Sequence, residues 1–314
     1  MRKFVAFFLL MISLRGVGQD TVSAAITEVP AEVKKVDYIW IFSYHRLINA
    51  NTVEILSPGI LEFSVIHNFG DIGGKFGGFK NFFGLDNAMD VRIGFQYGLS
   101  KRFNLIAARA KGASQVHQQY ELGLKYRMLQ QANDSRHPIS MTLFGNVVVA
   151  GGKPNVNPGQ EDSYEDFSDR FSQALQLMIA RKFGNISLQV SPTLVNRSFV
   201  LEGDEKTLFA VGGAFRLPVK GKFSVIFDYF HTFRSESSKD FFRARDLRFY
   251  DAVGVGIELL TAGHVFHMNF TNATEILPNR FVPRTVTSWG KGQFRWGFTI
   301  SRDFDLLWKK KQRK

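Results

Sequence analysis

Apolar and polar residues alternate along much of this chain, and the pattern is clearest between residues 120 and 128. Apolar or aromatic side chains occupy every second position there, at Tyr120, Leu122, Leu124, Tyr126 and Met128. Because successive side chains of a strand point to opposite faces, this segment has one oily face and one polar face. The same pattern recurs about a dozen times along the chain, which predicts a closed antiparallel sheet with one apolar and one wet surface.

The alternating segments predict about twelve strands, each about 9 to 14 residues long, which is the length that a tilted transmembrane strand needs. We expect strands at residues 59–69, 90–99, 102–110, 118–129, 138–150, 170–183, 185–196, 207–219, 222–233, 247–260, 263–271 and 292–303. A strand of a soluble protein usually has about five or six residues. No later stretch is apolar for long enough to form a membrane helix.

The connections between these strands are alternately short and long. Four short connections fall at residues 98–101, 183–185, 219–222 and 260–263, and the longest ones at 70–89, 151–169, 197–206, 234–246 and 272–291. Short turns on one rim and long loops on the other are typical of an outer-membrane barrel. An even number of strands then places both ends of the barrel on the short-turn, periplasmic side. The fold class we predict is an all-β, up-and-down transmembrane β-barrel.

Alternation alone would also fit a soluble β-sandwich or a lipocalin with the apolar face inside. The alternation of short and long connections is the main argument against this. Charged residues within the strands support it, because a small dry barrel would bury them at high cost. A barrel of about twelve strands is wide enough to hold water. The residues expected to line its lumen are Arg92, Gln96, Glu121, Lys125, Arg127, Gln176, Gln189 and Asp228.

The two ends of the chain are predicted to lie outside the barrel. Arg2 and Lys3, the apolar residues 4–14 and the small residues Gly16 and Gly18 fit a signal peptide cut before Gln19. We expect residues 19–58 to form a periplasmic lead-in or cap, 59–304 the barrel and 305–314 a basic tail. Within the lead-in, residues 37–56 alternate poorly, so a cap, a plug-like segment and an extra strand all stay open.

The charge and the cysteine content of the chain exclude several kinds of partner and site. The formal net charge is +12, but eight of the basic residues lie in the predicted signal peptide or in the last six residues, so we expect no nucleic-acid partner. The chain has no cysteine. This excludes disulfides, thiol catalysis and cysteine-bound metals, and we expect no cofactor.

Several stretches carry a resemblance to a known family. These are LEFSVIHNF at 61–69, FGDIGG at 69–74, FFGLDNA at 82–88, DVRIGFQYGL at 90–99 and ELGLKYR at 121–127. Together they resemble a family of outer-membrane β-barrel proteins of unknown function that is common in Bacteroidota, over about residues 30 to 304. The resemblance implies the barrel fold, a signal peptide and the outer membrane as location. It implies no catalytic residue.

The first long loop is rich in glycine and phenylalanine. Phe76, Phe79, Phe82 and Phe83 need apolar cover, and the glycines between them permit tight turns. The loop therefore forms a constriction in the barrel mouth, docks a partner, or packs on itself.

Metal and catalytic sites find weaker support. His264 and His267 are an odd number of residues apart, so a strand sends them to opposite faces. A metal site in the lumen would need His67, His231 and His267 to converge from different strands, which the sequence does not show. The acidic residues between Glu161 and Asp169 lack the spacing of a defined calcium-binding loop. A barrel hydrolase using His231 with Ser235 or Asp228 lacks a nucleophile motif. No metal site and no catalytic residue is predicted.

The function favoured by this pattern is a narrow passive pore for small solutes in contact with outer-membrane lipid, because a lumen of mixed charge suits a water-filled channel. The alternative is a structural or anchoring membrane partner of a periplasmic or surface protein complex. A barrel-embedded hydrolase comes third.

Overall fold

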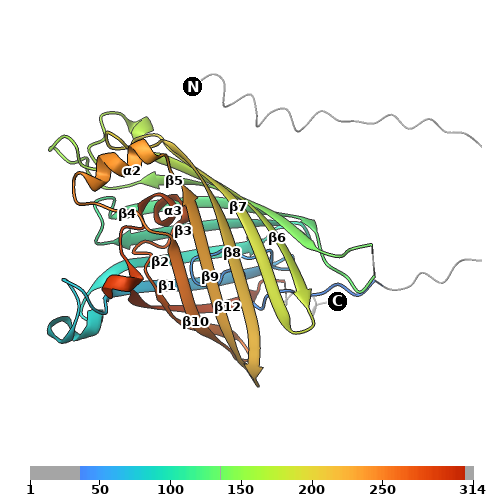
Figure 1. Ribbon diagram of the computed structural model, residues 1–314. Coiled ribbons are helices and arrows are strands. Elements are labelled where there is room, and N and C mark those ends of the chain that lie inside the picture. Colours follow the sequence, from blue (N-terminus) through green and yellow to red (C-terminus); the bar gives the residue numbers. More distant parts are fainter. Residues whose placement is uncertain (1–35, 135, 308–314) are drawn as a thin grey trace, which may run out of the picture. The chain divides into compact units, whose positions relative to one another are not determined.

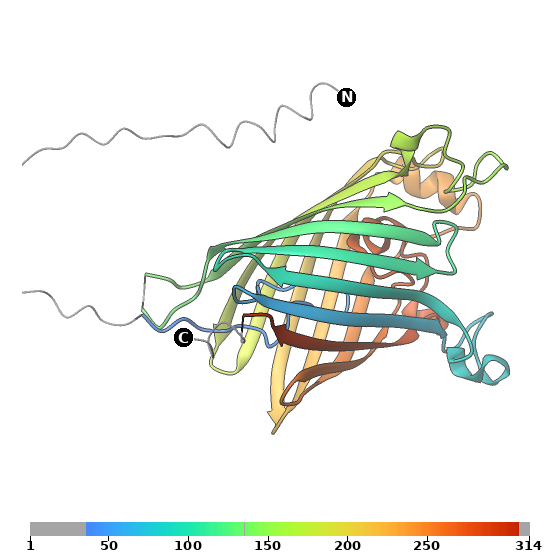
Figure 2. The same ribbon diagram turned by 180° about the vertical axis from the view of Figure 1, so that it is seen from behind.

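Twelve strands close into one antiparallel barrel in the computed structural model, which describes residues 36–134 and 136–307 (Figures 1 and 2). The strands are β1 Ile60–Asp71, β2 Ala88–Gly98, β3 Phe103–Gly112, β4 Gln118–Leu129, β5 Ser140–Ala150, β6 Phe171–Phe183, β7 Ile186–Arg197, β8 Thr207–Lys220, β9 Phe223–Phe233, β10 Ala252–Leu260, β11 His264–Thr271 and β12 Arg295–Asp305. The predicted signal peptide and most of the basic tail lie outside the described residues. The predicted fold class is confirmed.

Each strand pairs with its neighbours in sequence, and β1 pairs with β12 to close the ring. The largest error in the predicted strands is the start of β10, which begins at Ala252 and not at residue 247. There, the amide of Tyr250 donates to the carbonyl of Thr285, which lies in a long loop and not in a strand. Local alternation continues across this stretch, but its hydrogen bonds go elsewhere.

The alternation has the orientation that the charges indicated. In β4, Leu122 faces outward with 59% of its surface exposed, whereas the neighbouring Glu121 faces the lumen and is 6% exposed. Phe103 and Tyr126 stack across β3 and β4 at the short-turn end of the outer face, with ring centroids 4.7 Å apart. Aromatic rings at strand ends are typical of a membrane interface. The outer face is therefore the lipid-facing surface.

Helical segments occur only in the long loops of the described chain. They are η1 Phe79–Gly84, η2 Phe167–Arg170, α2 Glu236–Arg243, α3 Pro278–Arg284 and η3 Trp289–Lys291. None of the described helices has the length and apolar character needed to cross a membrane. Figure 1 shows α2 at the long-loop rim and α3 within the barrel mouth.

The lipid-facing surface can be tested at Leu122, which lies in the middle of β4. We expect Leu122→Arg to lower the free energy of unfolding by about 2–4 kcal/mol, because a charge there must sit in hydrocarbon. Val219→Arg, near the short-turn end of β8, is the matched control and should cost about 0–1 kcal/mol. Denaturant titration in lipid vesicles measures both. Equal costs would contradict this placement of the membrane.

Candidate functional site

Residues 36–58, here called the plug, enter the lumen from the short-turn rim. Every residue from Tyr44 to Leu56 is buried. Of the three interpretations that the sequence left open for residues 37–56, the structure has the plug-like segment, with only isolated bridges such as Tyr38 to Ala132. Irregular backbone at membrane depth requires hydrogen-bond partners, and the inner wall of the barrel supplies them.

Asp228 on β9 binds the turn at the tip of the plug. Its Oδ2 accepts hydrogen bonds from the backbone amides of Ile48, Asn49 and Ala50 at 3.0, 2.6 and 2.8 Å. Its Oδ1 accepts a fourth from the Asn49 side chain at 2.8 Å. One buried carboxylate thus satisfies three consecutive amides, and bonds of this charge-assisted kind are among the stronger ones in proteins.

Lys125 on β4 donates hydrogen bonds to backbone carbonyl groups of the plug. Its ammonium group donates to the carbonyl oxygens of His45 at 2.8 Å and Thr52 at 3.2 Å. The chain doubles back between these two residues, so one cation joins both limbs of the plug. The wall therefore offers an anion to plug amides and a cation to plug carbonyls.

Two glutamines of the wall complete the attachment. Gln189 on β7 accepts from the amide of Val53 at 2.9 Å and donates to the carbonyl of Asn51 at 2.7 Å. Gln176 on β6 accepts from the side chain of Asn51 at 2.7 Å. An amide side chain can donate and accept at once, which suits it to a passing backbone.

Carboxylates and cations also meet at the base of the plug. Glu54 of the plug accepts from the amides of Ile41 and Phe42, at 2.8 and 3.2 Å, and its other oxygen lies 3.6 Å from the guanidinium of Arg127. Across the lumen, Glu62 on β1 contacts His45 Nδ1 at 2.7 Å. Both limbs of the plug are therefore fixed by ionisable groups.

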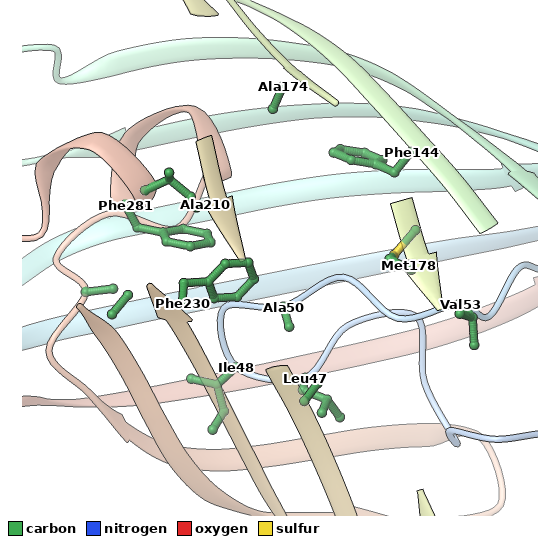
Figure 3. Close-up of a cluster of buried hydrophobic side chains, with 14 of the residues drawn as sticks. Leu47, Ile48, Ala50, Val53, Phe144, Ala174, Met178, Ala210, Phe230 and Phe281 are labelled. Carbon is green, nitrogen blue, oxygen red and sulfur yellow. The ribbon is translucent and has the colours of Figure 1, made fainter. Parts of the chain in front are cut away.

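Apolar contacts lie at the centre of this polar frame. Figure 3 shows Leu47, Ile48, Ala50 and Val53 of the plug among side chains that project from the barrel wall and from α3. The wall and α3 residues of this cluster include Phe144, Met178, Ala210, Phe230 and Phe281. The plug is thus packed as well as hydrogen-bonded.

The long loop at residues 272–294, here called the lid loop, fills the opposite end of the lumen. Its helix α3 is buried from Pro278 to Pro283. Arg280 pairs with Glu275 at 2.9 Å and with Glu161 of the β5–β6 loop at 2.6 Å. Arg46 of the plug donates to the carbonyl of Ile276, so the plug and the lid loop meet inside the barrel.

The lumen is closed where the plug and wall meet. A cavity bounded by Tyr44, Arg46, Arg92 and Glu121 has a volume of about 20 Å³. A space of this size holds about one water molecule. At this point of the lumen the plug therefore leaves room for little more than water.

All eight residues expected to line the lumen face it. Lys125, Arg127, Gln176, Gln189 and Asp228 contact the plug. Arg92 and Glu121 pair with each other at 2.7 Å, and Gln96 donates to Asn104. Sequence reasoning missed Asn104, which accepts from the amide of Leu56 at 2.6 Å. The alternation along β3 places Asn104 on the lumen-facing side, so the sequence pattern could have identified it.

The phenylalanines of the first long loop lie elsewhere. Phe76, Phe79, Phe82 and Phe83 are 65, 84, 57 and 46% exposed. They are neither buried in the mouth nor covered by their own loop. The lid loop, not this loop, occupies the mouth of the barrel.

The histidines considered for metal or catalysis are spread over both faces. His267 faces the lumen, whereas His67 packs beside Phe298 on the outer face and His231 is exposed. His231 Nδ1 lies 2.9 Å from Asp251, and not beside Asp228, which faces the lumen. No group of three or more potential metal ligands occurs among residues 36–134 and 136–307.

Similarity to known sequences gives the family. The model of the family described as "Membrane bound beta barrel domain (DUF5777)" matches residues 42–304. The chain belongs to this family. The match spans all twelve strands and begins inside the plug, so the family domain includes most of the plug. No curated protein matches the sequence.

Several solved outer-membrane proteins are similar in fold. The KdgM porin has a TM-score of 0.46 at 10% identity, over 77% of this chain and 99% of that one. The COG4313 outer membrane channel from Pseudomonas putida F1 has a TM-score of 0.46 at 14% identity, over 80% and 98%. The NanC porin has 0.45 at 6%, over 78% and 98%.

The role of Asp228 can be tested through the plug. In Asp228→Ala, three buried plug amides lose their acceptor, and each loss costs about 1–3 kcal/mol. We expect hydrogen exchange at Ile48, Asn49 and Ala50 to rise at least tenfold, because about 1.4 kcal/mol is a factor of ten. Glu258→Gln, which disturbs the wall pairs with Arg216 and His267 and removes no hydrogen bond to the plug tip, is the control. An equal rise in both variants would refute a specific attachment by Asp228.

The lid loop should respond to acid. Burial raises the pKa of Glu161, but the guanidiniums of Arg280 and Arg284 outweigh burial and hold this pKa below its usual range. A lowered folded-state pKa stabilises the docked loop above the ordinary value of about 4.3, and this contribution is lost as the pH falls through the lowered value. Exchange at residues 278–284, corrected for intrinsic rates, should therefore be faster near pH 3 than at pH 7.

Glu161→Gln should give fast exchange at both pH values, because the amide carries no charge at either. Glu165→Gln, which neutralises an exposed carboxylate of the same loop, should keep the response of the unmodified protein. A pH response that survives in Glu161→Gln would show that another group controls the loop.

Proposed function

We propose that the protein is an outer-membrane channel for small solutes that its own plug holds closed. Its location follows from the membrane-bound family and from the closed barrel with short turns on one rim. Export through a signal peptide at residues 1–18 is part of this proposal. The solute itself is not specified by the wall, which carries both signs of charge.

The observation that carries the proposal is the chemistry of the plug–wall boundary. Wall side chains such as Asp228, Lys125 and Gln189 bind the backbone of the plug, and each of these bonds is one that water can replace. A permanent plug would need such partners too, because irregular backbone at membrane depth must be hydrogen-bonded, so the proposal depends on how this wall behaves without the plug. The polar wall stays hydrated if the plug leaves, so an open state is accessible.

The packed lumen also supports a second candidate, a structural or anchoring partner of a periplasmic or surface complex. The plug and helix α3 of the lid loop fill much of the lumen with buried side chains. An anchor needs a stable, sealed barrel, whereas a channel needs a plug that moves. Conductance decides between the two.

A reversible cross-link between plug and wall provides the test. A Cβ added at Gly254 on β10 would lie 3.0 Å from the Cβ of Ile48, slightly less than the about 3.5–4.5 Å of a disulfide. The chain has no cysteine of its own, so Ile48→Cys with Gly254→Cys forms the only possible disulfide. The added Cβ would also lie 2.8 Å from Oδ1 of Asp228, so both the plug tip and this carboxylate must shift to accommodate the disulfide.

In planar bilayers, we expect discrete openings from the unmodified protein, none from the oxidised double variant, and their return on adding reductant. The single variant Ile48→Cys should be insensitive to reductant. Silence of the unmodified protein, of the reduced double variant and of Asp228→Ala would favour the anchor. Conductance that ignores the cross-link would place the path outside the plug.

A further inference from the structure

A large cavity opens at the short-turn rim, where the plug enters the barrel. Its volume is about 540 Å³. One side is formed by the plug, through Tyr38 and residues 55–58. The other is formed by the β2–β3 turn and by the end of β4. The cavity lies at the base of the plug, away from the plug tip that Asp228 binds.

The ionisable groups that line this cavity are basic. Lys101, Arg102, Arg127 and His137 contribute to the lining, and among the described residues no carboxylate does. The nearest acids lie behind these groups, Glu54 beside Arg127 at 3.6 Å and Asp134 beside His137 at 2.9 Å. The cavity is therefore an electropositive recess.

Two of these cations have no protein partner in the described part of the chain. No hydrogen bond from a side-chain nitrogen and no ion pair involves Lys101 or Arg102 within residues 36–134 and 136–307. Both belong to the short turn between β2 and β3, which keeps them beside the cavity. Unpaired guanidinium and ammonium groups that face one recess are suited to a phosphate, since guanidinium binds phosphate oxygens in a bidentate manner.

Most of the remaining lining is apolar, and it continues onto the lipid-facing surface. Met128 and Leu129 line the cavity and are 43 and 45% exposed. They follow Tyr126, whose ring stacks on Phe103 at the membrane interface. Trp40 of the plug is half exposed nearby and lies against the guanidinium of Arg127, 5.5 Å from it. A soluble anion needs no such apolar side, whereas a lipid does.

We infer that this recess binds a phosphate group, supplied by the headgroup of a membrane phospholipid in the short-turn leaflet. Lys101, Arg102 and Arg127 contact the phosphate oxygens. Met128 and Leu129 contact the glycerol and upper acyl carbons. A free phosphate offers the same oxygens to the cations and is the competing source of the ligand.

The test uses the full-length protein, delipidated in detergent. Phosphatidylglycerol is added, and bound lipid is measured by native mass spectrometry, with diacylglycerol as the probe that lacks the phosphate. Inorganic phosphate is titrated separately by phosphorus NMR. The variant is Lys101→Gln with Arg102→Gln. Its matched control is Lys220→Gln with Lys222→Gln, which removes the same charge from exposed positions at the β8–β9 turn.

We expect phosphatidylglycerol to bind and diacylglycerol not to bind. Affinity for the phospholipid should fall at least tenfold in the Lys101/Arg102 variant and stay within twofold in the control. Failure of inorganic phosphate to displace the lipid would support the headgroup as the source. Displacement of the lipid by inorganic phosphate, lost in the same variant, would support the phosphate site but replace the lipid by a soluble ligand.

Equal losses in both variants would show general attraction to a basic rim and would overturn the inference. Unchanged binding in both variants would do the same. Neither result depends on conductance, so the phosphate site and the channel stand or fall separately. The circular-dichroism spectrum of each variant and its heat-modifiable mobility in gel electrophoresis check that the barrel is folded.

Discussion

The need of every buried backbone amide and carbonyl for a hydrogen-bond partner governs this molecule. In the lipid-facing sheet, neighbouring strands meet that need, and pairing of β1 with β12 leaves no open edge. Inside the barrel, the plug has almost no secondary structure of its own. Its amides and carbonyls are satisfied by side chains such as Asp228 and Lys125. The polar lumen is thus shaped as a receptor for backbone.

Much of the barrel could be predicted from the chain because its signal is local. A period of two residues reveals each strand, and the phase of a charge within it reveals which face is wet. Glu121 and Lys125 share one phase on β4, and both face the lumen. The same local rule failed at the start of β10, where Tyr250 bonds to Thr285 far along the chain. Alternation reports the propensity of a stretch and not its partners.

The sequence does not distinguish a plug from a cap or a strand at residues 37–56, because the partners of the plug are distant in sequence. Asn49 and Asp228 are 179 residues apart, and nothing in either neighbourhood indicates the other. Apolar residues such as Ile41 and Leu47 have no regular period, so they suit a strand, a cap or a buried coil. The position of the lid loop inside the barrel could not be predicted for a similar reason. The sequence singled out the first long loop through phenylalanines such as Phe79, which is exposed. Arg280 of the lid loop instead lies in the lumen paired with Glu161 and Glu275, and the sequence does not indicate these pairs.

The position of the plug in the chain bears on how the barrel is assembled. The plug precedes β1, so it is synthesised before any strand, whereas the groups that bind it arrive with β4 and β9. The sheet must either wrap around the plug before β1 meets β12, or close first and receive the plug through the short-turn rim. In the second order, the carboxylate of Asp228 and the ammonium of Lys125 first face water inside an empty ring. A newly inserted barrel would then be leaky until its own N-terminal segment sealed it.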